Sequence, residues 1–340
     1  MIIDVNVYWL PKQLFDNKDL RERFINCVNR FSDSRAIFTK LDNGNSKFVI
    51  EKPIGEPSLD YFRDDYQLEH QLSDMDKGHI DKAILKLPGA QEWFDLDLCK
   101  FYNTELAKYV AKSKGRMLGL AVVPPYATEE NLRELDRAIN QLGLNGIQLS
   151  THCKDGYLDN PAYREFFRHV SQLNIPVYVH HTPVPMEYDS IKDYDNLRRS
   201  YGRCEDQIIA ISREVYSDLF EELPSLKLIH SMLGGGIFTY KTMLLPHDSG
   251  NGRFDTNNDI IKERLEKNIY YEMSHAQPWG KDNLEIATKI LGEDNIIYGS
   301  SYPVKKIWLT EGAKTIEKLG ISDQAKNKLL FENARKIYKI

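Results

Sequence analysis

Short apolar runs alternate with amphipathic stretches along most of the chain. Eight of these runs are short and nearly continuous, at residues 2–6, 80–87, 117–123, 145–149, 175–179, 227–230, 268–272 and 295–298. Continuous runs rich in Val, Ile and Leu are typical of parallel strands that helices cover on both faces, whereas half-exposed strands alternate. The pattern therefore predicts eight parallel strands.

Helix signals fill the intervals between these runs. Thr128 and Asn160 are expected N-caps, the first before two glutamates and the second before a proline. Eight strand–helix units in 340 residues predict an α/β fold, a single (β/α)₈ barrel domain over residues 1–340. An open doubly wound sheet is the alternative. Apolar residues recur at helical spacing over residues 98–110, 128–142, 160–173, 208–220, 284–291, 309–319 and 324–338.

One segment, residues 11–78, breaks the alternation. It is polar and contains an Asn-Gly-Asn turn signal at 43–45 and two prolines within 53–57. Because it follows the first strand, we expect an excursion that covers the C-terminal mouth of the barrel, where loops enclose active sites.

Composition and charge narrow the function classes. The chain has 45 Lys and Arg against 50 Asp and Glu, a net charge of −5, and no basic block. Nucleic acid is excluded as a partner, since phosphate binding needs clustered cations. We expect no membrane span and no signal peptide, because no long apolar run is present. Four distant cysteines show no zinc or redox spacing. These features predict a cytoplasmic protein with reduced thiols and a small-molecule substrate.

Candidate chemistry gathers at the predicted strand ends, where barrels place their active sites. Five of the nine histidines fall there, and histidine serves as base, acid or ligand near neutral pH. His180 and His230 have an alternative as core histidines, and His152 and His275 as surface residues. Lys86 could hold a substrate carboxylate or point outward beside a helix. The full candidate set is Asn6, Tyr8, Lys86, His152, His180, His181, His230, His275 and Ser301.

Several segments, in order, resemble the amidohydrolase-related (amidohydrolase-2) family, whose members include enzymes of the aminocarboxymuconate-semialdehyde decarboxylase type. The segments are 1–5, 115–124, 142–147, 176–180, 228–235, 299–303 and 332–334. Each is loose alone, but the ordered set is specific. The resemblance implies a barrel, a hydrolase or carboxy-lyase activity and a homodimer.

The resemblance also implies a metal at the barrel mouth, held by an H-x-H pair after strand 1, a histidine after strand 5 and an aspartate after strand 8. This chain keeps the strand-5 ligand as His180. It has Asn6 and Tyr8 in place of the pair and Ser301 in place of the aspartate. Neutral Asn, Tyr and Ser are weak donors for a divalent ion. We therefore expect no metal cofactor; the alternative is zinc or manganese held by His180 and His230.

These observations favour an enzyme, either a hydrolase or a decarboxylase, that acts without the usual metal on a small carboxylate-bearing substrate, cyclic substrates and lactones included. In this hypothesis His230 is the base, His180 orients or polarises, and Tyr8 stabilises an oxyanion. The expected substrate contacts are Asn6, Lys86, His152, His275 and Ser301. The alternatives are a non-catalytic small-molecule-binding barrel and a metal-dependent hydrolase with relocated ligands.

Overall fold

The computed structural model describes residues 1–154, 156–245, 258–275 and 277–340. Parallel strands form at all eight predicted runs, the third run splitting into two short strands around Leu120. They are β1 (Ile3–Tyr8), β5 (Lys82–Lys86), β6 (Met117–Gly119), β7 (Ala121–Val122), β8 (Ile147–Ser150), β11 (Val177–His180), β12 (Leu228–His230), β13 (Ile269–Glu272) and β14 (Ile296–Ile297). The fold is therefore α/β, as predicted.

These strands lie side by side in chain order. One sheet has the order β1-β5-β6 and the other β14-β13-β12-β11-β8-β7, with parallel pairing throughout. Two contacts link the first and last strands of this series: Val5 N donates to Tyr298 O at 3.1 Å, and Val7 forms a parallel bridge with Tyr302.

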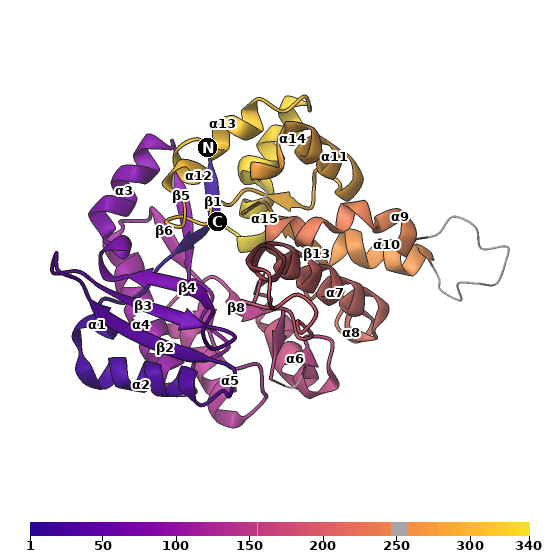
Figure 1. The fold of residues 1–340 in the computed structure, drawn as a ribbon. Coiled ribbons are helices and arrows are strands. Elements are labelled where there is room, and N and C mark those ends of the chain that lie inside the picture. The colour runs from indigo at the N-terminus through magenta and orange to yellow at the C-terminus, as the bar shows by residue number, and fades with distance from the viewer. Residues whose placement is uncertain (155, 246–257, 276) are drawn as a thin grey trace.

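Helices follow the strands and cover the sheets from outside (Figure 1). The Thr128 side chain accepts from Asn131 N and the Asn160 side chain from Ala162 N, which confirms both expected N-caps. The helices are α4 (Leu96–Lys112), α5 (Glu129–Asp136) continued by η2 (Arg137–Gln141), η3 (Pro161–Tyr163), α6 (Arg164–Leu173), η4 (Leu197–Tyr201), α7 (Gly202–Tyr216), α8 (Leu219–Glu222), η5 (Met232–Thr239), α9 (Lys241–Leu244), α10 (Asn258–Lys267), η6 (Gln277–Trp279), α11 (Lys281–Leu291), α12 (Lys306–Thr310), α13 (Gly312–Glu317), α14 (Asp323–Asn327), η7 (Lys328–Glu332) and α15 (Asn333–Tyr338).

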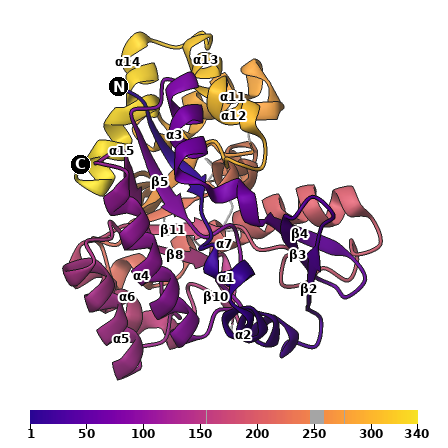
Figure 2. The same ribbon diagram turned by 90° about the vertical axis from the view of Figure 1, so that its left-hand side faces the viewer.

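Residues 11–78 contain more regular structure than their polar sequence predicts. Figure 2 shows their antiparallel sheet to one side of the parallel strands, away from the two chain termini. The sheet has the order β2-β3-β4, and most of β2 is exposed, so no apolar run marks it. Its elements are α1 (Gln13–Asp16), α2 (Lys18–Asn29), β2 (Arg35–Lys40), β3 (Ser46–Glu51), β4 (Pro57–Phe62), η1 (Arg63–Tyr66) and α3 (Leu68–Lys77). A further two-stranded ladder joins β9 (His152–Cys153) to β10 (Gly156–Tyr157).

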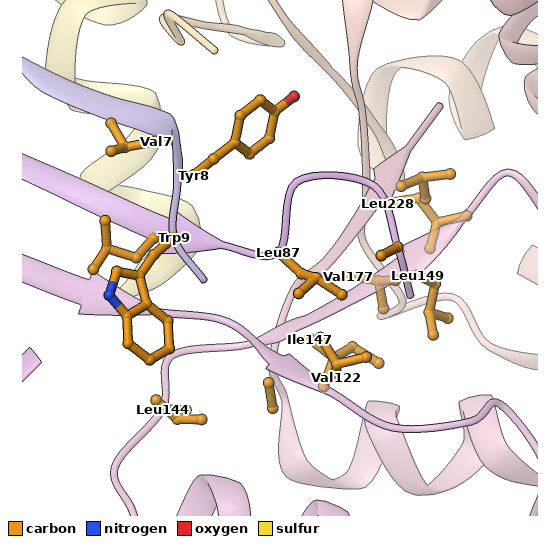
Figure 3. Close-up of a cluster of buried hydrophobic side chains, with 14 of the residues drawn as sticks. Val7, Tyr8, Trp9, Leu87, Val122, Leu144, Ile147, Leu149, Val177 and Leu228 are labelled. Atoms are coloured by element: carbon orange, nitrogen blue, oxygen red, sulfur yellow. The ribbon is translucent and has the colours of Figure 1, made fainter. Parts of the chain in front are cut away.

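Two apolar clusters use opposite faces of the parallel strands, because successive strand side chains alternate in direction. One cluster packs strands against helices and includes Val122, Ile147, Val177 and Leu228 (Figure 3). The other joins alternate strand residues with α15; its fully buried strand members are Ile3, Val5, Ile84, Leu120, Tyr178, Ile229 and Ile297. No helix within the described residues is long and apolar enough to cross a membrane.

Candidate active site

A cavity of about 260 Å³ lies at the carboxyl ends of the parallel strands. Residues that follow the strands form one part of its lining, and the remainder comes from β4, η1 and the η4–α7 region. Its polar lining residues are Tyr8, Ser58, Asp60, Tyr61, Asp65, Tyr66, His180, His181, Arg199, Arg203 and His275. Four predicted candidates, Tyr8, His180, His181 and His275, are thus brought together on one surface.

Tyr8 and His180 are joined by a hydrogen bond whose direction can be assigned. His180 Nδ1 lies 2.6 Å from the His181 carbonyl oxygen, which can only accept, so Nδ1 carries the proton. The neutral ring then has a lone pair on Nε2, and Tyr8 donates its hydroxyl proton to it at 2.9 Å. Burial, and behind it the Lys86 charge, holds the pKa of His180 well below its usual value, which keeps the ring neutral.

Asn6 and Ser301 extend this bond into a chain behind Tyr8. Asn6 Nδ2 donates to Ser301 Oγ at 3.1 Å, and Ser301 Oγ lies 3.2 Å from the Tyr8 hydroxyl. Because the Tyr8 proton is directed at His180, Ser301 is the donor to Tyr8. Asn6 and Ser301 are fully buried and do not line the cavity. They position Tyr8 and are not the substrate contacts that the sequence suggested.

Glu272 lies beneath this chain and takes several hydrogen bonds. Its Oε2 accepts from Asn6 Nδ2 at 3.1 Å, from the Tyr178 hydroxyl at 2.6 Å and from Ser274 Oγ at 2.6 Å. A Cβ at Gly299 would stand 1.9 Å from Glu272 Oε1, so only glycine leaves room for this carboxylate. Glu272 was not among the candidates from the sequence, because nothing in the apolar run that it ends distinguishes it from the other residues of that run.

Lys86 points into the protein interior below the cavity. Its Nζ donates to Val5 O at 2.9 Å and lies 2.9 Å from the centre of the Tyr178 ring. Burial lowers the pKa of Lys86 well below its usual value, although Glu272 and Asp4 oppose this shift. Lys86 is fully buried and absent from the cavity lining, so its role in holding a substrate carboxylate stays a prediction that this geometry does not support.

Two further histidines stand beside His180. The His181 ring stacks on His180 with 4.1 Å between centroids, and His275 meets His181 edge-on at 5.4 Å. Burial lowers the pKa of His275 to about 3 and that of His181 well below its usual range. All three rings are therefore neutral near pH 7 and can accept or donate hydrogen bonds without adding charge.

Arg203 supplies the cation that Lys86 does not. It lies in the first turn of α7, and its guanidinium donates to the backbone oxygens of Pro183 and Ser58. Burial, with the Arg199 charge behind it, lowers the pKa of Arg203 to about 10. Within the described part of the chain no carboxylate pairs with Arg203. No motif surrounds it, so the sequence offered no signal.

Asp65 and two tyrosines come from the segment before β5. Tyr61, Asp65 and Tyr66 all line the cavity. Tyr61 and Tyr66 are buried, and Asp65, which lies between them in the sequence, is partly buried. Burial, and then the neighbouring Asp64 charge, raises the pKa of Asp65 to about 6. A carboxyl group with such a pKa can exchange a proton near neutral pH. The polar sequence around Asp65 made it indistinguishable from a surface aspartate.

The family profile described as Amidohydrolase (Amidohydro_2) matches residues 86–340. The chain belongs to the amidohydrolase family. Its relatives include a 2-amino-3-carboxymuconate-6-semialdehyde decarboxylase from Dictyostelium discoideum, 28% identical over 246 residues that span 70% of this chain and 66% of the relative. A gamma-resorcylate decarboxylase from Rhizobium sp. is 25% identical over 322 residues, 86% of this chain and 94% of the relative.

A solved amidohydrolase-type structure has the same fold. It is a dihydroxybenzoic acid decarboxylase from Polaromonas sp. JS666 with bound manganese and the inhibitor 2-nitroresorcinol. It matches with a TM-score of 0.72 at 21% identity and covers 99% of this chain and 96% of its own. The resemblance found in the sequence is thereby confirmed at the level of family and fold.

The donor set of this amidohydrolase does not fit the metal that such a relative carries. Tyr8, Ser301 and His180 Nε2 use their polar atoms on one another, Asn6 joins them through Nδ2, and within the described residues Asn6 Oδ1 is buried without a hydrogen-bond partner. In the described residues no group of three or more His, Cys, Asp or Glu side chains is arranged to hold a metal ion. A divalent ion prefers imidazole and carboxylate donors, of which this position offers one.

His230 points away from the cavity. It ends β12, where its neighbour Ile229 belongs to the interior cluster, so alternation turns the His230 ring toward α7. There His230 Nδ1 lies 2.7 Å from Gln207 Oε1 and Nε2 lies 2.8 Å from Glu214 Oε2. The ring is fully buried. In this geometry His230 does not face the cavity, and its role as base or metal ligand stays a prediction, which the turnover of His230→Ala tests.

His152 is also placed elsewhere. It starts the short strand β9, and its Nε2 lies 3.1 Å from Thr182 Oγ1 and 3.7 Å from Asp206 Oδ2. Asp206 also accepts from the Tyr157 hydroxyl at 2.8 Å. His152 is buried in this network and does not line the cavity, so its role as a substrate contact stays a prediction that this geometry does not support.

Proposed function

We propose that this amidohydrolase is a carboxy-lyase that removes CO₂ from a small phenolic or conjugated carboxylate bound in the cavity. The carrying observation is Arg203, a guanidinium on the cavity wall without a carboxylate partner among the described residues. The decarboxylase relatives support the reaction class.

A substrate carboxylate is the natural partner for Arg203. The lowered pKa shows that its positive form is poorly stabilised where it stands, with Arg199 adding repulsion. A carboxylate bound there supplies the missing negative charge, and guanidinium–carboxylate pairs are strong and directional. Arg203 therefore selects an anionic group and fixes its orientation.

The remaining cavity side chains suit the rest of such a substrate. Tyr61, Tyr66 and the neutral histidines offer flat surfaces for a ring or a conjugated chain. The Tyr8 hydroxyl, held by Ser301 and His180, stands ready to contact a phenolic or enolic oxygen. Burial raises the pKa of Tyr8 above its usual value, so Tyr8 keeps its proton, which it donates to His180, and its oxygen can accept a hydrogen bond from a substrate hydroxyl.

We also infer the finer architecture from the same contacts. The bonds between β1 and the segment after β14 support closure of the eight strands into the predicted barrel. Side chains of β4 and η1 line the cavity, which supports the role of residues 11–78 as its cover.

Metal removal tests the cofactor part of this proposal. Hydrogen bonds already occupy the Tyr8 hydroxyl, Ser301 Oγ and both ring nitrogens of His180, and within the described residues only Asn6 Oδ1 of this chain is left buried without a partner. We therefore expect enzyme dialysed against EDTA to keep its full rate of CO₂ release. The measurement is CO₂ release from a panel of hydroxybenzoates and conjugated dicarboxylates, before and after chelation. Turnover that disappears with EDTA and returns with manganese or zinc would contradict metal independence but leave the carboxy-lyase activity standing.

Replacing Arg203 tests substrate binding. We expect Arg203→Gln to raise KM about 100-fold, since charged hydrogen bonds contribute up to about 3 kcal/mol, with Arg203→Lys in between. The matched control is Arg213→Gln on the same helix, where Arg213 makes only a half-exposed ion pair with Asp159. If Arg203→Gln and Arg213→Gln have equal KM values, Arg203 does not bind the substrate. A wild-type protein that binds these acids without releasing CO₂ is a binder.

A further inference from the structure

Decarboxylation needs a proton at the carbon that loses CO₂, and most groups of the cavity cannot give one. The lowered pKa values of His180, His181 and His275 leave these rings without a spare proton near pH 7. Tyr61 and Tyr66 hold their protons too tightly, because burial raises their pKa values well above the usual one. A proton donor has to come from another side chain.

Asp65 differs from Asp64 and Asp16, which are paired, and from Asp60, which also lines the cavity but is exposed. Asp64 and Asp16 are held by Arg63, at 2.9 and 2.7 Å. In contrast, no described residue donates a hydrogen bond to Asp65 or forms an ion pair with it. Asp65 nevertheless lies on the cavity wall and is partly buried there, on the same surface as Tyr8, His180 and Arg203. An unengaged carboxyl facing a binding cavity is available for chemistry.

We propose that Asp65 is the catalytic acid, which delivers the proton to the carbon that loses CO₂. This role rests on the proposed carboxy-lyase function. Asp65 belongs to the segment before residue 86, outside the part that matches the family profile, so the proton donor would be a feature of the cover of this chain.

The step balances with these groups alone. The neutral Asp65 carboxyl gives its proton to the ring or enol carbon that carries the carboxylate, and a C–H bond forms. The bond from that carbon to the carboxylate then breaks, its electron pair returns to the conjugated system, and CO₂ leaves. Asp65, now a carboxylate, takes a proton from water to restore the starting state. Arg203 holds the carboxylate until it leaves.

Charged and titratable groups surround Asp65 on several elements. Asp64 on the same turn repels the ionised form and favours the acid. The same cavity is lined by Asp60 of β4, by Arg199 and Arg203 of the η4–α7 region and by the three neutral histidines. Burial, and behind it the Asp65 charge, raises the pKa of Tyr66. The pKa of Tyr302 is raised by burial and then by Asp74, and the Asp65 charge adds to this. Bound substrate brings a negative charge, which further favours the protonated acid.

The test is the pH dependence of kcat in three variants. Because the acid form is the active one and the pKa of Asp65 is about 6, kcat/KM of the wild type should fall as pH rises through that value, and kcat should fall at a higher pH because bound substrate favours the acid. Asp65→Asn should lower kcat at least about 100-fold, within the range for general acids, with KM nearly unchanged. Asp65→Glu should keep a reduced rate with the same type of pH limb. The control is Asp42→Asn, an exposed aspartate of the same segment.

Two outcomes separate this role from the proposed function. If the wild type releases no CO₂ from any substrate, the carboxy-lyase proposal fails and the acid role fails with it. If the wild type is active while Asp65→Asn keeps its kcat and its pH limb, only the acid role is overturned. Loss of activity with a matching loss of thermal stability, not shared by Asp65→Glu, would also overturn it in favour of a structural role.

Discussion

His230→Ala is expected to lower the free energy of unfolding by about 3–5 kcal/mol, as for other buried charge partners that lose their counterpart. Glu214 is fully buried, and His230 Nε2 at 2.8 Å is its hydrogen-bond partner. Burial raises the pKa of Glu214, and the contact with His230 opposes this. Without the His230 ring, the Glu214 carboxyl group stays buried without its partner, beside the empty space that the ring has left. Urea unfolding followed by circular dichroism measures the loss.

The matched control is His169→Ala. His169 pairs with Asp136 at 2.8 Å, but both side chains are partly exposed, so the expected change is below about 1 kcal/mol. Folded His230→Ala enzyme should keep most of its turnover, since the ring does not reach the cavity. A variant as stable as wild type but without activity would restore the catalytic role suggested by the sequence.

The unpredicted direction of His230 has a definite physical origin. Strand side chains alternate between the two faces of a sheet, but both faces are apolar here. The sequence of such a strand therefore does not show which residues face the interior and which face the helices. In β11, Tyr178 and His180 share the inward face; in β12, Ile229 takes that face and His230 the outer one. Position at a strand end was predictable, but direction was not.

The parts of the fold that have a clear apolar pattern in the sequence were predictable, and the parts without such a pattern were not. All eight continuous runs became strands because burial on both faces leaves a clear apolar signature. The sheet of β2, β3 and β4 left none, since it is exposed on one side. That sheet and the turn after it carry Tyr61 and Asp65, so the missed structure also concealed part of the candidate site.

Arg203 was missed for a related reason. A single arginine at the start of an amphipathic helix is ordinary, and only the fold shows that it faces a cavity without an acidic partner. Tyr8, in contrast, was predictable as a site residue through its place at the end of the first strand. Site residues at the ends of the parallel strands could be identified from their position in the sequence. Site residues on helices and in residues 11–78 could be identified only from the structure.

Combining Asn6→His, Tyr8→His and Ser301→Asp is expected to create a metal site that the wild type lacks. Together with His180 these changes give four imidazole and carboxylate donors at the strand ends. If about 10 kcal/mol of metal binding is shared among four ligands, three of them contribute roughly 8 kcal/mol, or about 10⁶-fold in affinity. Elemental analysis should find close to one equivalent of zinc or manganese in the variant and less than about a tenth in the wild type.

A thermal shift gives a second readout that does not depend on activity. The triple variant loses the Asn6 bonds to Glu272 and Tyr178, so its metal-free form should melt below the wild type. Manganese at about 100 times its Kd should then add roughly 2.7 kcal/mol of stability to the variant and nothing to the wild type. Adding His180→Ala to the triple variant should abolish the shift. A wild type that itself gains stability with manganese, or is purified with a full equivalent, would show that its present side chains already hold the ion.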